Sequence, residues 1–109
     1  MCMQLRGGRV SRELSGLRRL VLDVLKPLKD PSIVDVALEL AKVPGVQGVN
    51  ITVNEVDVET LSLTVVIEGD NIEFDGIRRV LEEVGAAIHS IDQVVAGEKF
   101  VEIPRRPQE

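Results

Sequence analysis

Acidic side chains gather in one stretch of the sequence, residues 54–75 (NEVDVETLSLTVVIEGDNIEFD). The stretch contains seven carboxylates, and no Lys or Arg occurs between Lys42 and Arg78. Carboxylate oxygens bind hard cations such as calcium and magnesium, and pairs of carboxylates perform general acid and base catalysis. The seven residues are Glu55, Asp57, Glu59, Glu68, Asp70, Glu73 and Asp75.

The first three of these acids form a stripe on one side of an expected strand. Glu55, Asp57 and Glu59 would project at intervals of ~6.6 Å, over which like charges repel unless water, salt or a cation intervenes. We expect Asp57 to lie opposite Thr64, with Asp23 beyond it on the next strand. The pattern is more typical of a solvated strand edge that discourages pairing with other chains. The hypothesis beside it is that Asp57 and Glu59, with Asp23 or a neighbouring subunit, bind calcium or magnesium weakly.

Other polar groups are better explained without a ligand. Asp70 is expected to cap a helix by accepting a hydrogen bond from the N–H of Glu73. His89, Ser90 and Asp92 do not form a triad, because neighbouring residues of a strand point to opposite faces. The sequence therefore predicts no catalytic residue and no residue that binds an organic cofactor.

The N-terminal half predicts a strand, a helix and a second strand. Residues 16–27 alternate between apolar and polar positions as a strand does. Residues 29–45 have helical spacing, with Asp30 as the N-cap and Pro31 at the first helical position. In the strand over residues 46–60, the apolar positions change phase near Asn54, which predicts a bulge there if both sets are to reach the core.

The remaining elements complete a hairpin, a helix and a last strand. A two-residue turn at Thr60 and Leu61 would pair the second strand with residues 61–69, placing Val58 opposite Leu63 and Val56 opposite Val65. A helix follows within residues 70–87, with Asp70 or Asn71 as its cap and Gly85 at its end. The final strand covers residues 87–103 and is expected to break at Gly97.

This order of elements, β-α-β-β-α-β, predicts an α+β ferredoxin-like split β-α-β sandwich. Right-handed connections give an antiparallel sheet with strand order 4-1-3-2 and both helices on one face. We expect a loosely ordered basic arm at residues 1–15, the domain at residues 16–103 and a flexible tail at residues 104–109. The open sheet face is expected to carry Val21, Asp23, Leu25, Glu55, Asp57, Glu59, Ser62, Thr64, Val66 and Glu68.

Composition limits the classes of function. The chain has 109 residues, 44% of them apolar, and a net charge of −5, which argues for one soluble domain and against nucleic-acid binding. No apolar run is long enough to cross a membrane. Cys2 is the single cysteine, so a disulfide framework is excluded and a reducing cytoplasm is expected.

The expected elements resemble a known family. GLRRLVLDVLKP, PSIVDVALELAKVPGVQGVNITVNEVDVET and IEGDNIEFDGIRRVLEEVGAAIHSIDQVVAGEKFVE are similar to the archaeal domain of unknown function 211. The resemblance implies a ferredoxin-like domain that assembles into closed rings of identical subunits. It implies no activity and supplies no catalytic residues.

Two classes of function follow from these patterns. The first is a non-enzymatic homo-oligomeric binding or regulatory module that holds a divalent cation or a small metabolite near subunit interfaces. Val21, Leu25 and Val66 would form an apolar patch on the open face, and such patches mark interfaces. The second class is a small enzyme that uses Asp23, Asp57 or Glu59 as general acid and base.

Overall fold

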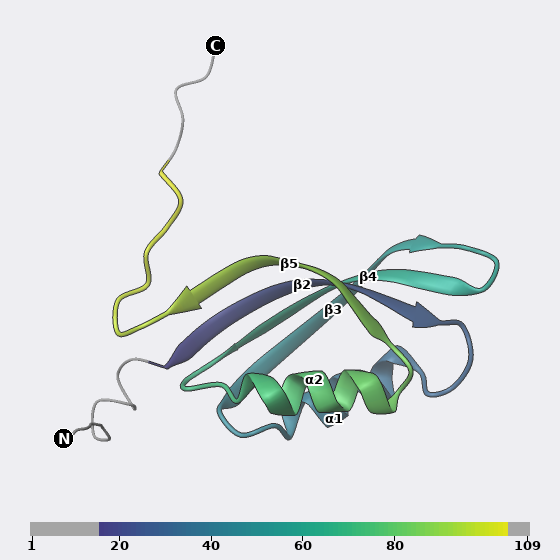
Figure 1. Ribbon diagram of the computed structural model, residues 1–109, viewed down its shortest axis with the longest axis horizontal. Helices are drawn as coiled ribbons and strands as arrows, with labels where there is room; N and C mark the ends of the chain where they lie inside the picture. Colours follow the sequence, from purple (N-terminus) through teal and green to yellow (C-terminus); the bar gives the residue numbers. More distant parts are fainter. Residues whose placement is uncertain (1–15, 105–109) are drawn as a thin grey trace, which may run out of the picture.

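The computed structural model describes residues 16–104, which form a four-stranded antiparallel sheet with two helices on one face (Figure 1). The predicted arm and most of the predicted tail lie outside these residues. Strand order is β3-β4-β2-β5, which matches the predicted order 4-1-3-2. The α+β ferredoxin-like fold is thus confirmed. Its elements are β2 (Leu17–Pro27), α1 (Ile33–Ala41), β3 (Val46–Val56), β4 (Thr60–Gly69), α2 (Phe74–Glu83) and β5 (Ala87–Ala96).

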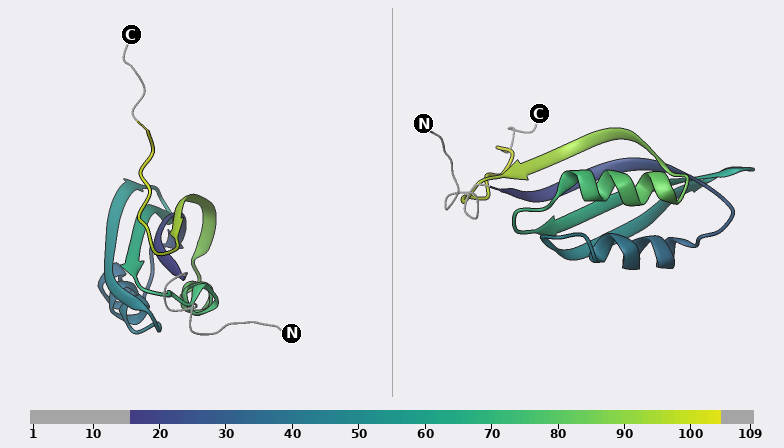
Figure 2. Two further views of the ribbon diagram at one scale, coloured as in Figure 1. Left: turned by 90° about the vertical axis from the view of Figure 1, so that its left-hand side faces the viewer. Right: turned by 60° about the horizontal axis from the view of Figure 1, so that its bottom comes forward.

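The core lies between the sheet and the helices, as two layers seen from the side (Figure 2). The two central strands, β2 and β4, alternate strictly, with every second side chain buried. The helices cover these side chains with two apolar stripes of their own. Because the buried residues are almost all Val, Leu and Ile, the core is aliphatic. Its strand members are Leu20, Leu22, Val24, Leu63, Val65 and Ile67, and its helix members are Val36, Leu40, Ile77 and Leu81.

Lys26 continues the inward row of β2 beyond Val24 and is only 2% exposed. Its ammonium donates hydrogen bonds to the backbone carbonyl of Pro27 at 2.9 Å and of Lys29 at 2.7 Å. A buried charge is costly unless such partners satisfy it. Lys26 therefore holds the connection between β2 and α1 against the end of the sheet.

The first helix begins later than predicted. Ser32, in an extended conformation, is the N-cap, and its hydroxyl accepts a hydrogen bond from the N–H of Asp35 at 3.3 Å. The carbonyl of Ser32 accepts the first helical bond, from the N–H of Val36 at 3.0 Å. The prediction of Asp30 as N-cap and Pro31 as the first helical residue was wrong, because these residues lie in the preceding connection.

The hairpin between β3 and β4 confirms the bulge but not the predicted turn. The register shifts between Val53 and Glu55, where the sequence changes phase. Val56 pairs with Leu61, and the N–H of Asp57 donates to the carbonyl of Thr60 at 2.8 Å, so Val58 and Glu59 form the turn.

The turn lies two residues earlier than predicted, so the partner of Val56 is Leu61 and not Val65, which is four residues further along β4. Val56 and Val58 were expected in the core but are 64% and 85% exposed. The hairpin tip extends past both helices (Figure 1), so no apolar layer is present to bury them. The carboxylate of Asp57 accepts from the N–H of Val58 at 2.7 Å, which stabilises the turn where it occurs.

The second helix also has a different start from the predicted one. Glu73 is its N-cap and makes no side-chain capping bond, while the N–H of Glu73 donates to the carbonyl of Pro44 at 3.1 Å. Asp70, predicted as the cap, instead pairs with Arg18 at 3.6 Å. The interaction of this segment with the α1–β3 connection takes the place of a side-chain cap.

The helix ends near Gly85, as predicted. Gly85 has a φ of 79°, and its N–H donates to the carbonyl of Glu82 at 3.1 Å. The N–H of Ala86 donates to the carbonyl of Leu81 at 2.9 Å, which completes a Schellman motif. The following strand, β5, stops before Gly97, and residues 97–104 form no second strand piece.

Candidate functional site

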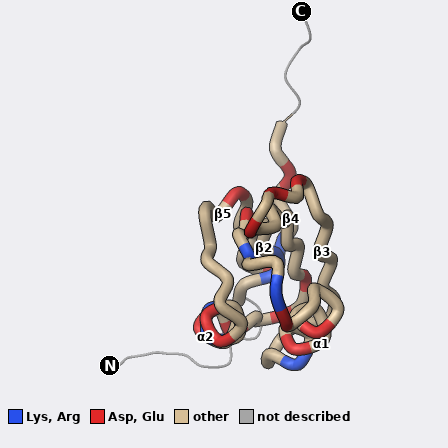
Figure 3. The backbone as a smooth tube through the Cα atoms, turned by 90° about the vertical axis from the view of Figure 1, so that its right-hand side faces the viewer, with Lys and Arg blue, Asp and Glu red and all other residues tan. Residues whose placement is uncertain are grey.

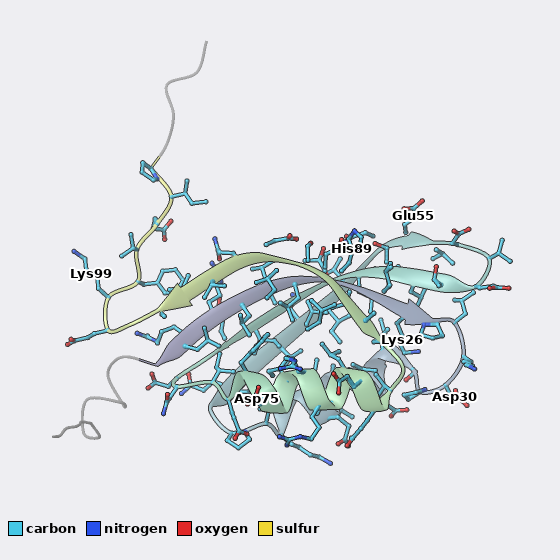
Figure 4. The ribbon with its side chains drawn as sticks, viewed as in Figure 1. Lys26, Asp30, Glu55, Asp75, His89 and Lys99 are labelled. Carbon is cyan, nitrogen blue, oxygen red and sulfur yellow. The ribbon has the colours of Figure 1, made fainter. Side chains whose placement is uncertain are left out.

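The open face of the sheet has a hollow of about 220 Å³ at its hairpin end. Side chains from all four strands and from the hairpin turn surround it. Glu55 and His89 project from the face opposite the helices (Figure 4). The lining residues are Asp23, Leu25, Glu55, Asp57, Thr60, Ser62 and His89.

Strand register explains why these residues meet. Asp23 is an outward residue of β2, opposite Thr64 on β4 and Ser90 on β5. Ser62 on β4 lies opposite Leu25 of β2 on one side and Glu55 of β3 on the other. The bulge after Val53 is needed for this arrangement, because it brings Glu55 to the outward side of β3. A local irregularity in β3 thus determines the acidic side of the hollow.

The structure brings together only two of the three predicted metal ligands. Asp23 and Asp57 line the same hollow, although Asp57 is not opposite Thr64 as expected; Thr52 occupies that position. Glu59 lies elsewhere, beside Lys29 in a separate hollow of about 430 Å³. The carbonyl of Glu59 accepts from the N–H of Leu28 at 3.1 Å. Because Glu59 is itself a turn residue, it does not continue the stripe.

Two further ionisable residues of the hollow, Glu55 and His89, were not predicted as site residues. Glu55 was placed on the correct face by the phase change at Asn54, which was the available signal. His89 was interpreted as an ordinary strand residue, and the sequence offers no signal that β5 would carry it to Asp57. Within residues 16–104, no three His, Cys, Asp or Glu side chains are close enough together to hold a metal ion.

Charge is distributed unevenly along the open face. At the end of the sheet remote from the hairpin, acidic residues are paired: Arg18 with Asp70 at 3.6 Å and Arg19 with Glu68 at 2.8 Å. In the part of the chain that the structure describes, no ion pair involves the acids of the hollow, which are Asp23, Glu55 and Asp57. The hairpin end is therefore the place where a cation would gain most from local negative charge.

The chemistry of the hollow is that of an oxygen-rich cation or polar-ligand site. Carboxylates from Asp23, Glu55 and Asp57 are accompanied by the hydroxyls of Thr60 and Ser62. Such oxygen ligands suit calcium and magnesium, which prefer six or more oxygens including water. The imidazole of His89 adds a group that can donate or accept a hydrogen bond to a small polar molecule.

Comparison with known proteins places the chain in a family. Residues 18–109 match the model of the domain of unknown function 211, described as uncharacterized ArCR. An uncharacterized protein of Methanocaldococcus jannaschii is 51% identical over 96 residues, which cover 88% of this chain and 98% of that protein.

The chain belongs to the domain of unknown function 211 family. This confirms the resemblance seen in the sequence, and the match runs from β2 to the last residue. Within residues 16–104, no helix of this family member is long and apolar enough to span a membrane. The family is described as uncharacterized, so a function for this chain is inferred from the site.

Proposed function

We propose that the protein is a non-enzymatic, homo-oligomeric binding module of the cytoplasm that holds a divalent cation or a small polar metabolite in the open-face hollow. The observation that supports this proposal is the convergence of Asp23, Glu55 and Asp57 with His89 around one hollow of about 220 Å³. A hollow of that volume has room for a hydrated ion, since water occupies ≈ 30 Å³ per molecule in the liquid.

The proposed ion is calcium or magnesium, and Asp23 and Asp57 are its proposed ligands. Both ions bind carboxylate oxygens and retain water in incomplete sites. The three acids of the hollow come from two strands and a turn, so they are not arranged as a continuous binding loop. We therefore expect weak binding, with a Kd on the order of 10⁻⁴ to 10⁻³ M, the range of the weakest calcium-binding modules.

A second copy of the chain would complete the site. Calcium takes six to eight oxygens, more than the described residues of one chain bring to a single point. Leu25 is 38% exposed beside the hollow, and the neighbouring Val21 and Val66 are half-buried. Contact between copies near this face would bury those side chains and bring further oxygen ligands to the ion.

Calorimetric titration of the full chain with calcium chloride and magnesium chloride tests the proposal. The double variant Asp23→Asn, Asp57→Asn should weaken cation binding at least about 10-fold, because it removes two of the three charges around the hollow. Glu59→Gln is the matched control and should change the Kd less than about 2-fold, because Glu59 lies outside the hollow.

Three results would contradict the proposal. Absence of binding heat at millimolar calcium and magnesium would show that the hollow does not bind these cations. An equal loss of affinity in Glu59→Gln shows that the effect is general surface charge and not a site. A particle mass of 12.0 kDa in light scattering would show that the protein is a monomer and not an oligomer.

A further inference from the structure

Strand β3 has a free edge that is unusually open to pairing. Among the described residues 16–104 it pairs with β4 alone, and its other side forms one border of the sheet. Residues 46–54 (VQGVNITVN) include no charged side chain, and acids begin only at Glu55. A long edge strand without charges is a template for another strand, since its N–H and C=O groups are unpaired. Glu55 and Asp57 place charge only at the hairpin end, so residues 46–54 form an uncharged edge.

The flank of α1 adds an apolar surface beneath the same edge. Val34 and Leu38 are 63% and 58% exposed, and Ala41 is exposed one turn further along. These residues are three or four positions apart, so they form one stripe. The side of α1 toward α2 carries Glu39 and Lys42 instead, which line a hollow shared with α2.

This stripe therefore points away from α2. Figure 3 shows α1 below β3 and α2 below β5, so the side of α1 away from α2 is the side of the free β3 edge. An additional strand beside β3 could form hydrogen bonds with the main-chain N–H and C=O groups along this edge. Its inward side chains would meet Val34 and Leu38.

In the part of the chain that the structure describes, residues 99–103 belong to no strand. After Gly97 the chain leaves the sheet and turns away from it (Figure 1). In residues 99–103 (KFVEI), Phe100, Val101 and Ile103 are 40%, 70% and 77% exposed. Val101 and Ile103 are two positions apart and would share one face of a strand. Because this segment follows β5, it starts at the sheet border opposite β3, which favours the β3 edge of another copy.

We propose that residues 99–103 of one copy add as a strand to the free edge of β3 in a second copy, with Val101 and Ile103 packed on the flank of α1. Charge favours a parallel alignment in which Ile103 lies beside Val53. In the sequence, Arg105 follows Ile103 by two positions, as Glu55 follows Val53, and Arg106 comes next. A parallel strand would thus bring bases to the acidic hairpin.

This contact is head to tail, because each copy offers a segment and an edge to different neighbours. Repetition of such a contact closes into a ring or continues as a filament. The inference rests on the homo-oligomer of the proposed function and specifies which surfaces join. It does not depend on whether the open-face hollow binds a cation.

Cross-linking between mixed copies tests the contact directly. In full chains carrying Cys2→Ser, the variant Val53→Cys is mixed with the variant Ile103→Cys under mild oxidation. We expect a disulfide-linked dimer that contains one chain of each kind. In the control mixture, Val94→Cys on β5, the opposite border, replaces Val53→Cys; Val94 is 55% exposed and Val53 39%. We expect at least about 10-fold less mixed dimer in the control. Equal yields would overturn the proposal.

Light scattering across a dilution series supplies the second measurement. Val101→Lys with Ile103→Lys should weaken association about 100-fold or more, since full burial of each aliphatic side chain is worth roughly a factor of 10. The control Ile91→Lys with Val94→Lys, at exposed sites on β5, should leave association unchanged. A wild-type particle of 12.0 kDa overturns this inference together with the proposed oligomer. An oligomer that survives Val101→Lys with Ile103→Lys overturns this inference alone.

Discussion

Gly69→Ala should destabilise the protein strongly, although it adds only one methyl group. Gly69 is the last residue of β4, is buried, and pairs with Val46 of β3. A Cβ at this position would overlap the carbonyl oxygen of Gly45 and lie 2.9 Å from its carbonyl carbon. That oxygen accepts a hydrogen bond from the N–H of Asp70 at 2.8 Å. The added methyl group therefore meets backbone that is already held in place.

The expected loss can be worked out from these contacts. Insertion of one carbon into a packed site costs typically ~1–3 kcal/mol, and a lost backbone hydrogen bond costs about 1 kcal/mol. The smaller backbone entropy of Ala in the unfolded chain offsets roughly 0.4–1 kcal/mol. The net change is a decrease of about 2–3 kcal/mol in the free energy of unfolding, or roughly 10–20 °C in Tm for a domain of this size.

Urea denaturation followed by circular dichroism measures this change. Protein concentration should be held fixed, because the stability of an oligomer depends on it. Gly48→Ala is the control: Gly48 lies on β3 in the same corner of the sheet, but a Cβ there meets nothing within 4 Å. This control should be neutral or stabilising by up to ~1 kcal/mol, because Gly weakens a strand relative to Ala. Equal midpoints for the two variants would refute the argument from close approach.

Two further substitutions test the connection between β2 and α1. Ser32→Ala should lower the free energy of unfolding by about 1 kcal/mol, the usual loss for an N-cap, whereas Asp30→Ala should change it by less than ~0.5 kcal/mol. Thermal melting of the two variants measures this difference. A larger loss for Asp30→Ala would show that Asp30 is the cap. Lys26→Met should cost about 1–3 kcal/mol because it leaves the carbonyls of Pro27 and Lys29 without their donor, and Lys26→Ala should cost more because it also empties the buried stem. Equal urea midpoints for the two Lys26 variants would show that the stem contributes nothing.

The parts of the fold that could be predicted from sequence are those in which local periodicity and burial agree. Leu20, Leu22 and Val24 alternate in a strand that helices cover along its length, so one register alone buries them. The phase change at Asn54 also located the bulge, although Val56 and Val58, whose burial was the reason for that prediction, are exposed. The two helix starts were missed because several residues near each start could cap, and tertiary contacts such as Glu73 with Pro44 selected among them.

The candidate site likewise has features that the sequence predicted and features that it did not. Sequence alone determined the order of elements, the aliphatic core and the outward position of Asp23, because each follows from an alternation that the core enforces. Only the tertiary structure decided that Asp57 would meet Asp23 and His89, and that Glu59 would not. The hairpin tip lies beyond the helices, where burial cannot select a register. The turn therefore formed at Val58 and Glu59, where backbone and Asp57 hydrogen bonds favour it, and that turn determined which acids share the hollow.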